Sequence, residues 1–107
     1  MTQQEEQPVL LTIRIKTAKW ENLKRAHDTV FGEAIYSDPE SGLISAKVYR
    51  SNSDSNDVMF VSEWQSEEDI NKFARTHGQR FNEIAGTGAD DGEDTIWRLA
   101  DAMTHDS

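Results

Sequence analysis

The chain has 107 residues and no cysteine, and 20 acidic against 11 basic side chains give it a formal net charge of −9. This length suits one small domain, and the lack of cysteine excludes disulfides, cysteine zinc sites and thiol nucleophiles. An acidic surface repels phosphate backbones and anionic headgroups, so we expect neither nucleic acid nor a membrane as partner. No apolar run could cross a bilayer and the start is polar, so a cytoplasmic location is expected.

One domain is expected over residues 9–103. A disordered tail is expected over residues 1–8, and a frayed end over residues 104–107. The first element is a half-buried strand that begins at Val9, because apolar and polar residues alternate there up to Lys16.

The segment behind that strand carries apolar residues at helical spacing, which predicts a long amphipathic helix capped by Thr17. Pro39 and Gly42 are expected to end this helix and turn the chain. Alternation over Ile44–Tyr49 predicts a second strand, and the turn-forming segment SNSDSND follows it.

A third strand is predicted over Val58–Trp64, paired with the second as an antiparallel hairpin. Ser66 and Asp69 have the spacing of a capping box, so a second helix is predicted to begin there and to run toward Ala85. The acidic segment GTGADDGED is a predicted loop, and a last strand is expected over Thr95–Met103.

The order β-α-β-β-α-β predicts an α+β, ferredoxin-like fold, in which a four-stranded antiparallel sheet carries both helices on one face. The other face is then uncovered. We expect it to be partly apolar, lined by Leu10, Leu43, Trp97 and Leu99 or by their alternating partners. A partly apolar open face predicts burial against a second copy, so a homodimer is expected.

Several functions open to this fold are disfavoured by the residues. An RNA-recognition module needs basic and aromatic residues on the open sheet, whereas the third strand reads VMFVSEW and has no basic residue. The acidic loops do not follow the pattern of a calcium loop and are interpreted as solvated turns. The chain has no nucleophile elbow, phosphate-binding glycine loop, dinucleotide fingerprint or HExxH motif, so we expect no cofactor and no metal.

His27 and His77 are the candidates for acid–base chemistry, because each falls on the apolar stripe of its predicted helix. Either histidine could simply be a core residue whose ring is held by a hydrogen bond. The alternative is that both line a cavity between helices and sheet, where a neutral imidazole could accept a proton. Trp20 and Trp64 would then supply flat apolar walls and indole N–H donors.

The segments PVLLTIRIKT, DPESGLISAKVYRS and VMFVSEWQSEEDINKFARTHGQRF together resemble the antibiotic biosynthesis monooxygenase (ABM) domain. The EWQS corner, which opens the second helix, is the most specific part. The resemblance covers residues 9–103 and implies a dimeric α+β barrel with a ligand cavity in each subunit. It also implies oxygenation of a phenol or quinol without any cofactor, in which the deprotonated substrate itself reduces oxygen.

On this resemblance we expect a monooxygenase that acts on a small hydrophobic aromatic substrate. The expected catalytic residues are His77, His27 and Trp64. The expected substrate contacts are Trp20, Phe31, Tyr49, Phe60 and Phe73. The alternative is a small-molecule-binding or stress-response module of the same fold without turnover. Haem degradation is disfavoured, because Phe73 and Glu83 stand where that branch has a tryptophan and a ligating histidine, and the first strand has no asparagine.

Overall fold

A computed structural model describes residues 7–16, 18–88 and 91–105. The first six residues of the expected tail, the Thr17 cap and the last two residues lie outside this part. In chain order the elements are β1 (Val9–Ile15), α1 (Trp20–Ala26), η1 (His27–Phe31), α2 (Gly32–Tyr36), β2 (Leu43–Arg50), β3 (Val58–Trp64), α3 (Glu67–Ala85) and β4 (Gly92–Arg98).

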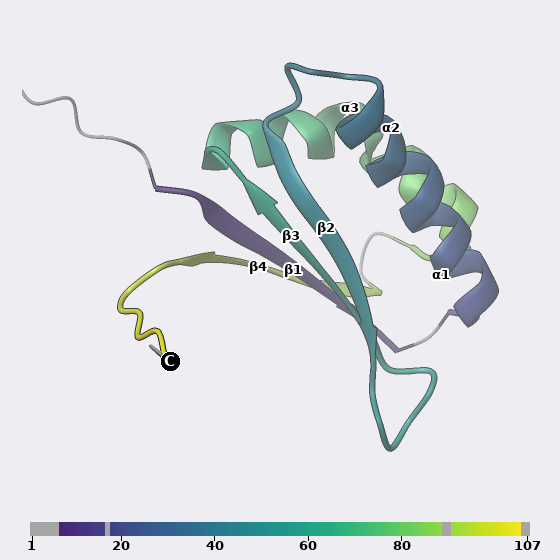
Figure 1. Cartoon of the computed structure of the whole chain (residues 1–107). Coiled ribbons are helices and arrows are strands. Elements are labelled where there is room, and N and C mark those ends of the chain that lie inside the picture. Colours follow the sequence, from purple (N-terminus) through teal and green to yellow (C-terminus); the bar gives the residue numbers. More distant parts are fainter. Residues whose placement is uncertain (1–6, 17, 89–90, 106–107) are drawn as a thin grey trace, which may run out of the picture.

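The strands form one antiparallel sheet in the order β2-β3-β1-β4. All helices lie on one face of this sheet and leave the other face open, as Figure 1 shows. The ferredoxin-like α+β fold expected from the sequence is therefore confirmed. Within the described residues, no helix is both long and apolar enough to cross a membrane.

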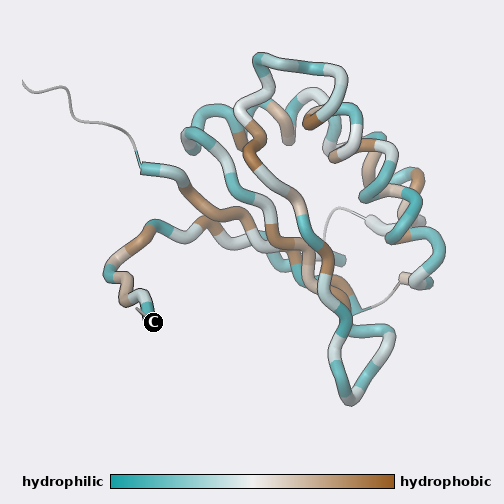
Figure 2. Tube along the Cα trace, viewed as in Figure 1, coloured by the Kyte–Doolittle hydropathy of each residue, from teal (hydrophilic) through white to brown (hydrophobic). Residues whose placement is uncertain are grey.

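The hydrophobic core lies between the sheet and the helices, because strand residues alternate between the two faces. On β3, Val58, Phe60 and Trp64 are buried, whereas Met59 lies on the open face. Figure 2 shows hydrophobic segments within the strands and a hydrophilic loop between β2 and β3. The core is thus confined to one side of the sheet.

The first helical segment is one run from Trp20 to Tyr36 that contains a π-helical turn, η1, between α1 and α2. The expected long helix is confirmed, but its 3.6-residue spacing gave no sign of the π turn. Leu23, Val30 and Phe31 form part of its buried face.

The expected cap of the second helix is confirmed. The Asp69 backbone N–H donates to Ser66 Oγ at 3.2 Å, and the Ser66 hydroxyl donates to Asp69 Oδ2 at 2.9 Å. This arrangement satisfies a free N–H in the first turn of α3. At the other end, Gly86 ends the helix in the left-handed region, with φ of 74°.

One expectation about the strands is wrong, and another, which left two alternatives open, is decided. The last strand covers Gly92–Arg98 rather than Thr95–Met103, because it is an edge strand that pairs only with β1, whose pairing ends at Val9 opposite Arg98. Leu43 lies on the helix side, since it pairs with Trp64 and a register shift follows it in β2. Leu10 and Trp97 do lie on the open face, 38% and 52% exposed.

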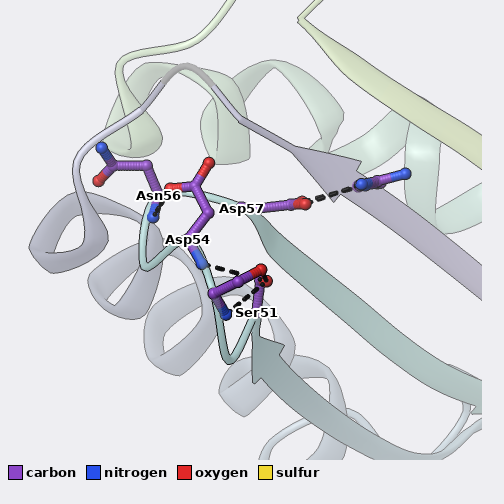
Figure 3. Close-up of polar contacts among 6 residues, drawn as sticks. Ser51, Asp54, Asn56 and Asp57 are labelled. Atoms are coloured by element: carbon purple, nitrogen blue, oxygen red, sulfur yellow. Dashed lines mark hydrogen bonds and ion pairs between the residues drawn. The ribbon is translucent and has the colours of Figure 1, made fainter.

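The loop between β2 and β3 is held by its own polar residues (Figure 3). Ser51 Oγ accepts from the Asp54 backbone N–H at 3.3 Å, and Asp54 Oδ1 accepts from the Asn56 N–H at 3.0 Å. Asp57 receives two hydrogen bonds from the Arg14 guanidinium, at 3.0 and 2.7 Å.

Across residues 7–16, 18–88 and 91–105, no group of three or more histidine, aspartate or glutamate side chains could hold a metal ion.

Candidate active site

A mostly apolar cleft, which we call the main cleft, lies on the helix side of the sheet, between α3 and the paired strands β1 and β4, and has a volume of about 460 Å³. This volume is within the usual range for a small-molecule site. Its walls are mostly aliphatic and aromatic side chains. The lining residues are Leu11, Ile13, Ile15, Phe31, Ile70, Asn71, Phe73, Ala74, Gly78, Phe81, Asn82, Gly88, Gly92, Asp94 and Ile96.

Asp94 is the one titratable side chain among these lining residues. It lies on β4 opposite Ile13, and the strand alternation points it toward the helices together with Ile96. The carboxylate remains accessible from solvent on its outer side, while neighbouring atoms remove part of its hydration. This burial raises the pKa of Asp94 above its ordinary value of 3.8.

Two amides complete the polar part of the cleft. Asn71 and Asn82 lie on α3, and both line the hollow. The Thr87 hydroxyl donates to Asn82 Oδ1 at 3.1 Å. This contact distinguishes the two ends of the Asn82 amide and leaves its NH₂ group as a donor.

Six of the eight side chains expected at the site form one continuous aromatic cluster. Phe31 lies at its centre, with its ring centroid 5.0 Å from that of Phe73 and 6.4 Å from that of Phe60. Trp64 lies 5.0 Å from Phe73 on the other side. Of these six side chains, Phe31 and Phe73 line the main cleft, together with Phe81, whose ring centroid lies 5.9 Å from that of Phe31. The other members are Phe60, Trp64, His27 and His77.

His77 does not line the main cleft. Its ring packs on Phe73 with centroids 5.1 Å apart, and it lines a separate hollow of about 50 Å³. Asp38, Ser41 and Lys72 line that hollow. Its volume is far below that of an aromatic ligand, so His77 lies at a place where such a ligand does not fit.

His27 begins the π turn and stacks on Phe60, with centroids 5.8 Å apart. Its Nδ1 lies 3.4 Å from Asp28 Oδ1. Its Nε2 is buried and has no hydrogen-bond partner among the described residues. His27 lines a second depression with Tyr36 and Ala46, so the two histidines do not share a cavity.

Trp64 is fully buried, and its indole N–H is already used inside the protein. The Nε1 atom donates to Ser62 Oγ at 2.8 Å, and that hydroxyl lies 3.4 Å from the Leu11 carbonyl oxygen. The N–H group therefore bonds to the core rather than to the cleft.

Trp20 and Tyr49 lie away from the main cleft. Trp20 packs at the start of α1 beneath the Arg50 guanidinium, which lies 4.5 Å from the ring centroid. Tyr49 lies on the open face opposite Met59 and is 54% exposed. This position separates Tyr49 from every hollow on the helix side.

Asp94 was not among the site residues predicted from the sequence, because its segment was predicted to be an acidic loop. The residue belongs to β4, which begins at Gly92. Its alternation with Ile96 is the signal that could have placed it on the helix side. That signal was hidden because GADDGED resembles a solvated turn.

Residues 8–83 match the family model of the antibiotic biosynthesis monooxygenases, ABM. The chain therefore belongs to this family. Among the curated proteins, none matches it in sequence.

Solved structures share the fold at low sequence identity. A candidate antibiotic biosynthesis monooxygenase from Caulobacter crescentus CB15 superimposes with a TM-score of 0.71 at 10% identity, over 91% of this chain and 93% of that one. SnoaB, a cofactor-independent oxygenase from Streptomyces nogalater, gives 0.70 at 8% identity, over 92% and 97%. A candidate monooxygenase from Bordetella bronchiseptica gives 0.68 at 10% identity, over 87% and 97%.

Proposed function

We propose that the protein is a cofactor-independent monooxygenase that acts on a small hydrophobic aromatic substrate bound in the main cleft. In the overall reaction, a CH₂ group activated by neighbouring rings becomes C=O. One atom of O₂ enters the product and the other leaves as water, so the substrate supplies all four electrons.

The observation that carries this proposal is the cleft of about 460 Å³ in a chain of the ABM family. Phe31, Phe73 and Phe81 offer flat apolar walls to a ring system. An apolar cleft limits the hydration of a substrate anion, which strengthens its interactions with the few polar groups present. The cleft therefore suits an aromatic substrate that must become an anion before it reacts.

Gly78 allows the cleft to be filled without disturbing the fold. It lines the cleft from α3, and a Cβ atom at this position would meet nothing within 4 Å. A leucine there projects into the hollow and is a better helix former than glycine. Gly78→Leu should therefore keep the fold and lose turnover.

The test is oxygen uptake by the purified protein with anthrone and with hydroxyanthrones, which carry such a CH₂ group, compared with the uncatalysed rate. Gly32→Leu is the matched control, since Gly32 is also helical, also has open space, and lines a different depression. Turnover that survives Gly78→Leu would place the chemistry elsewhere. No uptake above background by the wild type, with any of these compounds, would overturn the proposed function.

A second candidate function is binding of the same class of molecule without turnover. It is favoured by one observation, namely that neither His27 nor His77 lines the main cleft. Fluorescence titration with 2-naphthol distinguishes the candidates. Binding that Gly78→Leu abolishes, without oxygen uptake by the wild type, would favour the binding module.

We further propose that the working protein is a homodimer joined through the open sheet face. Leu10, Met59 and Trp97 expose apolar surface there. The charged residues of the same strand face are Arg14, Lys47, Glu63 and Glu93, two of each sign. The chain as a whole has a net charge of −9, so two copies repel each other electrostatically. The open face carries equal numbers of acidic and basic strand residues, so this repulsion is weakest when two copies meet through it.

A further inference from the structure

We propose that Asp94 is the general base of the main cleft, and that it takes the acidic proton of the substrate. This inference rests on the proposed function, because it names the group that generates the substrate anion. Asp94 lies beyond residues 8–83, which match the family, so the family match carries no information about it.

The position of Asp94 on β4 places its carboxylate at the edge of the main cleft. Asp94 faces the helices from the edge strand, with Gly92 and Ile96 as its neighbours on the same face. Gly92 has no side chain to cover the cleft wall, and a Cβ atom there would lie 3.3 Å from Ile13 Cγ2. The carboxylate therefore borders an apolar floor and points toward space that a ligand can occupy.

The Asp94 carboxylate has no hydrogen-bond partner among the described residues. The pKa values of Asp57, Glu33 and Asp28 are lowered, because each bonds to a basic side chain. The pKa of Asp94 is raised by burial alone, and no described residue bonds to its oxygens. A raised pKa makes a carboxylate a stronger base, and unoccupied oxygens leave it able to accept a proton.

No other charged described residue faces Asp94 within the cleft. From β1 it meets Ile13, and the cleft-lining residues of α3 are apolar, glycine or asparagine. Glu93 lies on the opposite face of β4. The Asp91 carboxylate precedes the strand and accepts the Gly88 N–H at 2.7 Å.

The proton step is balanced. The substrate O–H, or a C–H of the activated CH₂ group, gives its proton to an Asp94 carboxylate oxygen, and the bonding electron pair stays on the substrate as the anion. The NH₂ group of Asn82 is a donor that can bond to the developing oxyanion. The protonated Asp94 afterwards returns its proton to solvent through the open side of the cleft.

The first test is the pH profile of oxygen uptake in wild type and Asp94→Asn. We expect the variant to lose kcat by about 100-fold or more, and to lose the limb on which wild-type activity rises with pH. Glu83→Gln removes a carboxylate from the exposed side of α3 and should behave as wild type. Asp94→Asn with the wild-type profile would overturn the assignment.

The second test needs no turnover. It compares the affinity of 2-naphthol with that of 2-methoxynaphthalene, which has the same rings but no O–H. We expect wild type to bind 2-naphthol about tenfold more tightly than 2-methoxynaphthalene. In Asp94→Asn this ratio should fall to about threefold or less, because a hydrogen bond to a charged group is roughly twice as strong as one to a neutral group.

The two tests separate the two proposals. A naphthol preference that depends on Asp94, without oxygen uptake by the wild type, would overturn the monooxygenase and support Asp94 as proton acceptor. Oxygen uptake without such a preference, and with an unchanged Asp94→Asn profile, would overturn only Asp94. Failure of wild type to bind either compound, together with no oxygen uptake above background, would overturn both.

Discussion

The indole Nε1 of Trp64 donates to Ser62 Oγ at 2.8 Å, and both side chains are buried on the helix side of β3. Removing the hydroxyl would leave a buried N–H without a partner, which costs more than the hydrogen bond itself contributes. Ser62→Ala should therefore lower the free energy of unfolding by about 1–3 kcal/mol, measured by urea denaturation.

The double variant gives the control for this prediction. In Trp64→Phe the N–H is absent, so adding Ser62→Ala to it should cost less than the same change costs in wild type. Equal costs in both backgrounds would show that the hydrogen bond does not stabilise the core.

Gly42 lies so close to the Asp69 side chain that no larger residue fits at position 42. Gly42 has φ of 82°, and a Cβ atom at this position would lie 2.2 Å from Asp69 Oδ2. The same Asp69 carboxylate accepts the hydroxyl of the cap residue Ser66. Gly42→Ala should destabilise by more than about 1 kcal/mol, from the left-handed backbone and the displaced cap together.

Gly32→Ala is the matched control in thermal unfolding. Gly32 is helical with φ of −62°, and an added Cβ would meet nothing within 4 Å. Alanine there should be neutral or stabilise by about 0.5–1 kcal/mol. A stable Gly42→Ala protein would mean that Asp69 can move away without losing the cap.

The fold could be predicted from local patterns because alternation and helical spacing directly report which residues face the core. The cap at Ser66 and the strand from Val9 follow from short segments in this way. The register shift in β2 and the limits of β4 could not be predicted, because both depend on the neighbouring strand. The length of β4 is set by β1, far away in the sequence.

The candidate site was harder to predict, because aromatic residues at core spacing look the same whether or not a cleft lies beside them. Phe31 and Phe73 line the cleft, whereas Phe60 lies in the core near them. His77 lies on the stripe of α3, but Phe73 separates it from the rest of the cluster. The position of Asp94 on the helix side follows only once β4 is known to begin at Gly92, and the acidic, glycine-containing composition of this segment looks like a turn instead of a strand.

The open sheet face predicts the behaviour of surface variants in solution. Met59 is 36% exposed on the open face of the central strand β3, so a lysine there would place an added charge within the proposed interface. Met59→Lys should sediment as a monomer where wild type sediments as a dimer. The change makes the chain less acidic, so added net repulsion cannot explain the dissociation.

Tyr36→Lys is the control for this measurement. Tyr36 is 87% exposed at the end of α2, on the helix side of the molecule, so its replacement should leave a dimer. A wild-type protein that sediments as a monomer at micromolar concentration would contradict the proposed homodimer.

The pair of Arg14 and Asp57 predicts an acid dependence of stability. The guanidinium holds the pKa of Asp57 below its ordinary value of 3.8, so the folded state binds this proton less readily than the unfolded state does. The contribution of the pair is complete above pH 3.8 and is lost as the pH falls through the folded pKa. Asp57→Asn should therefore differ most from wild type above this pH, and progressively less below it, in urea denaturation.

Asp94→Asn should change stability with the opposite sign. Burial raises the pKa of Asp94, so the folded state binds that proton more readily, and its carboxylate destabilises the fold as the pH rises above 3.8. Relative to wild type, Asp94→Asn should gain stability with increasing pH while Asp57→Asn loses it. An Asp94→Asn curve that runs parallel to the wild-type curve would show that folding leaves the pKa of Asp94 unchanged, and would remove the electrostatic support for its role as a base.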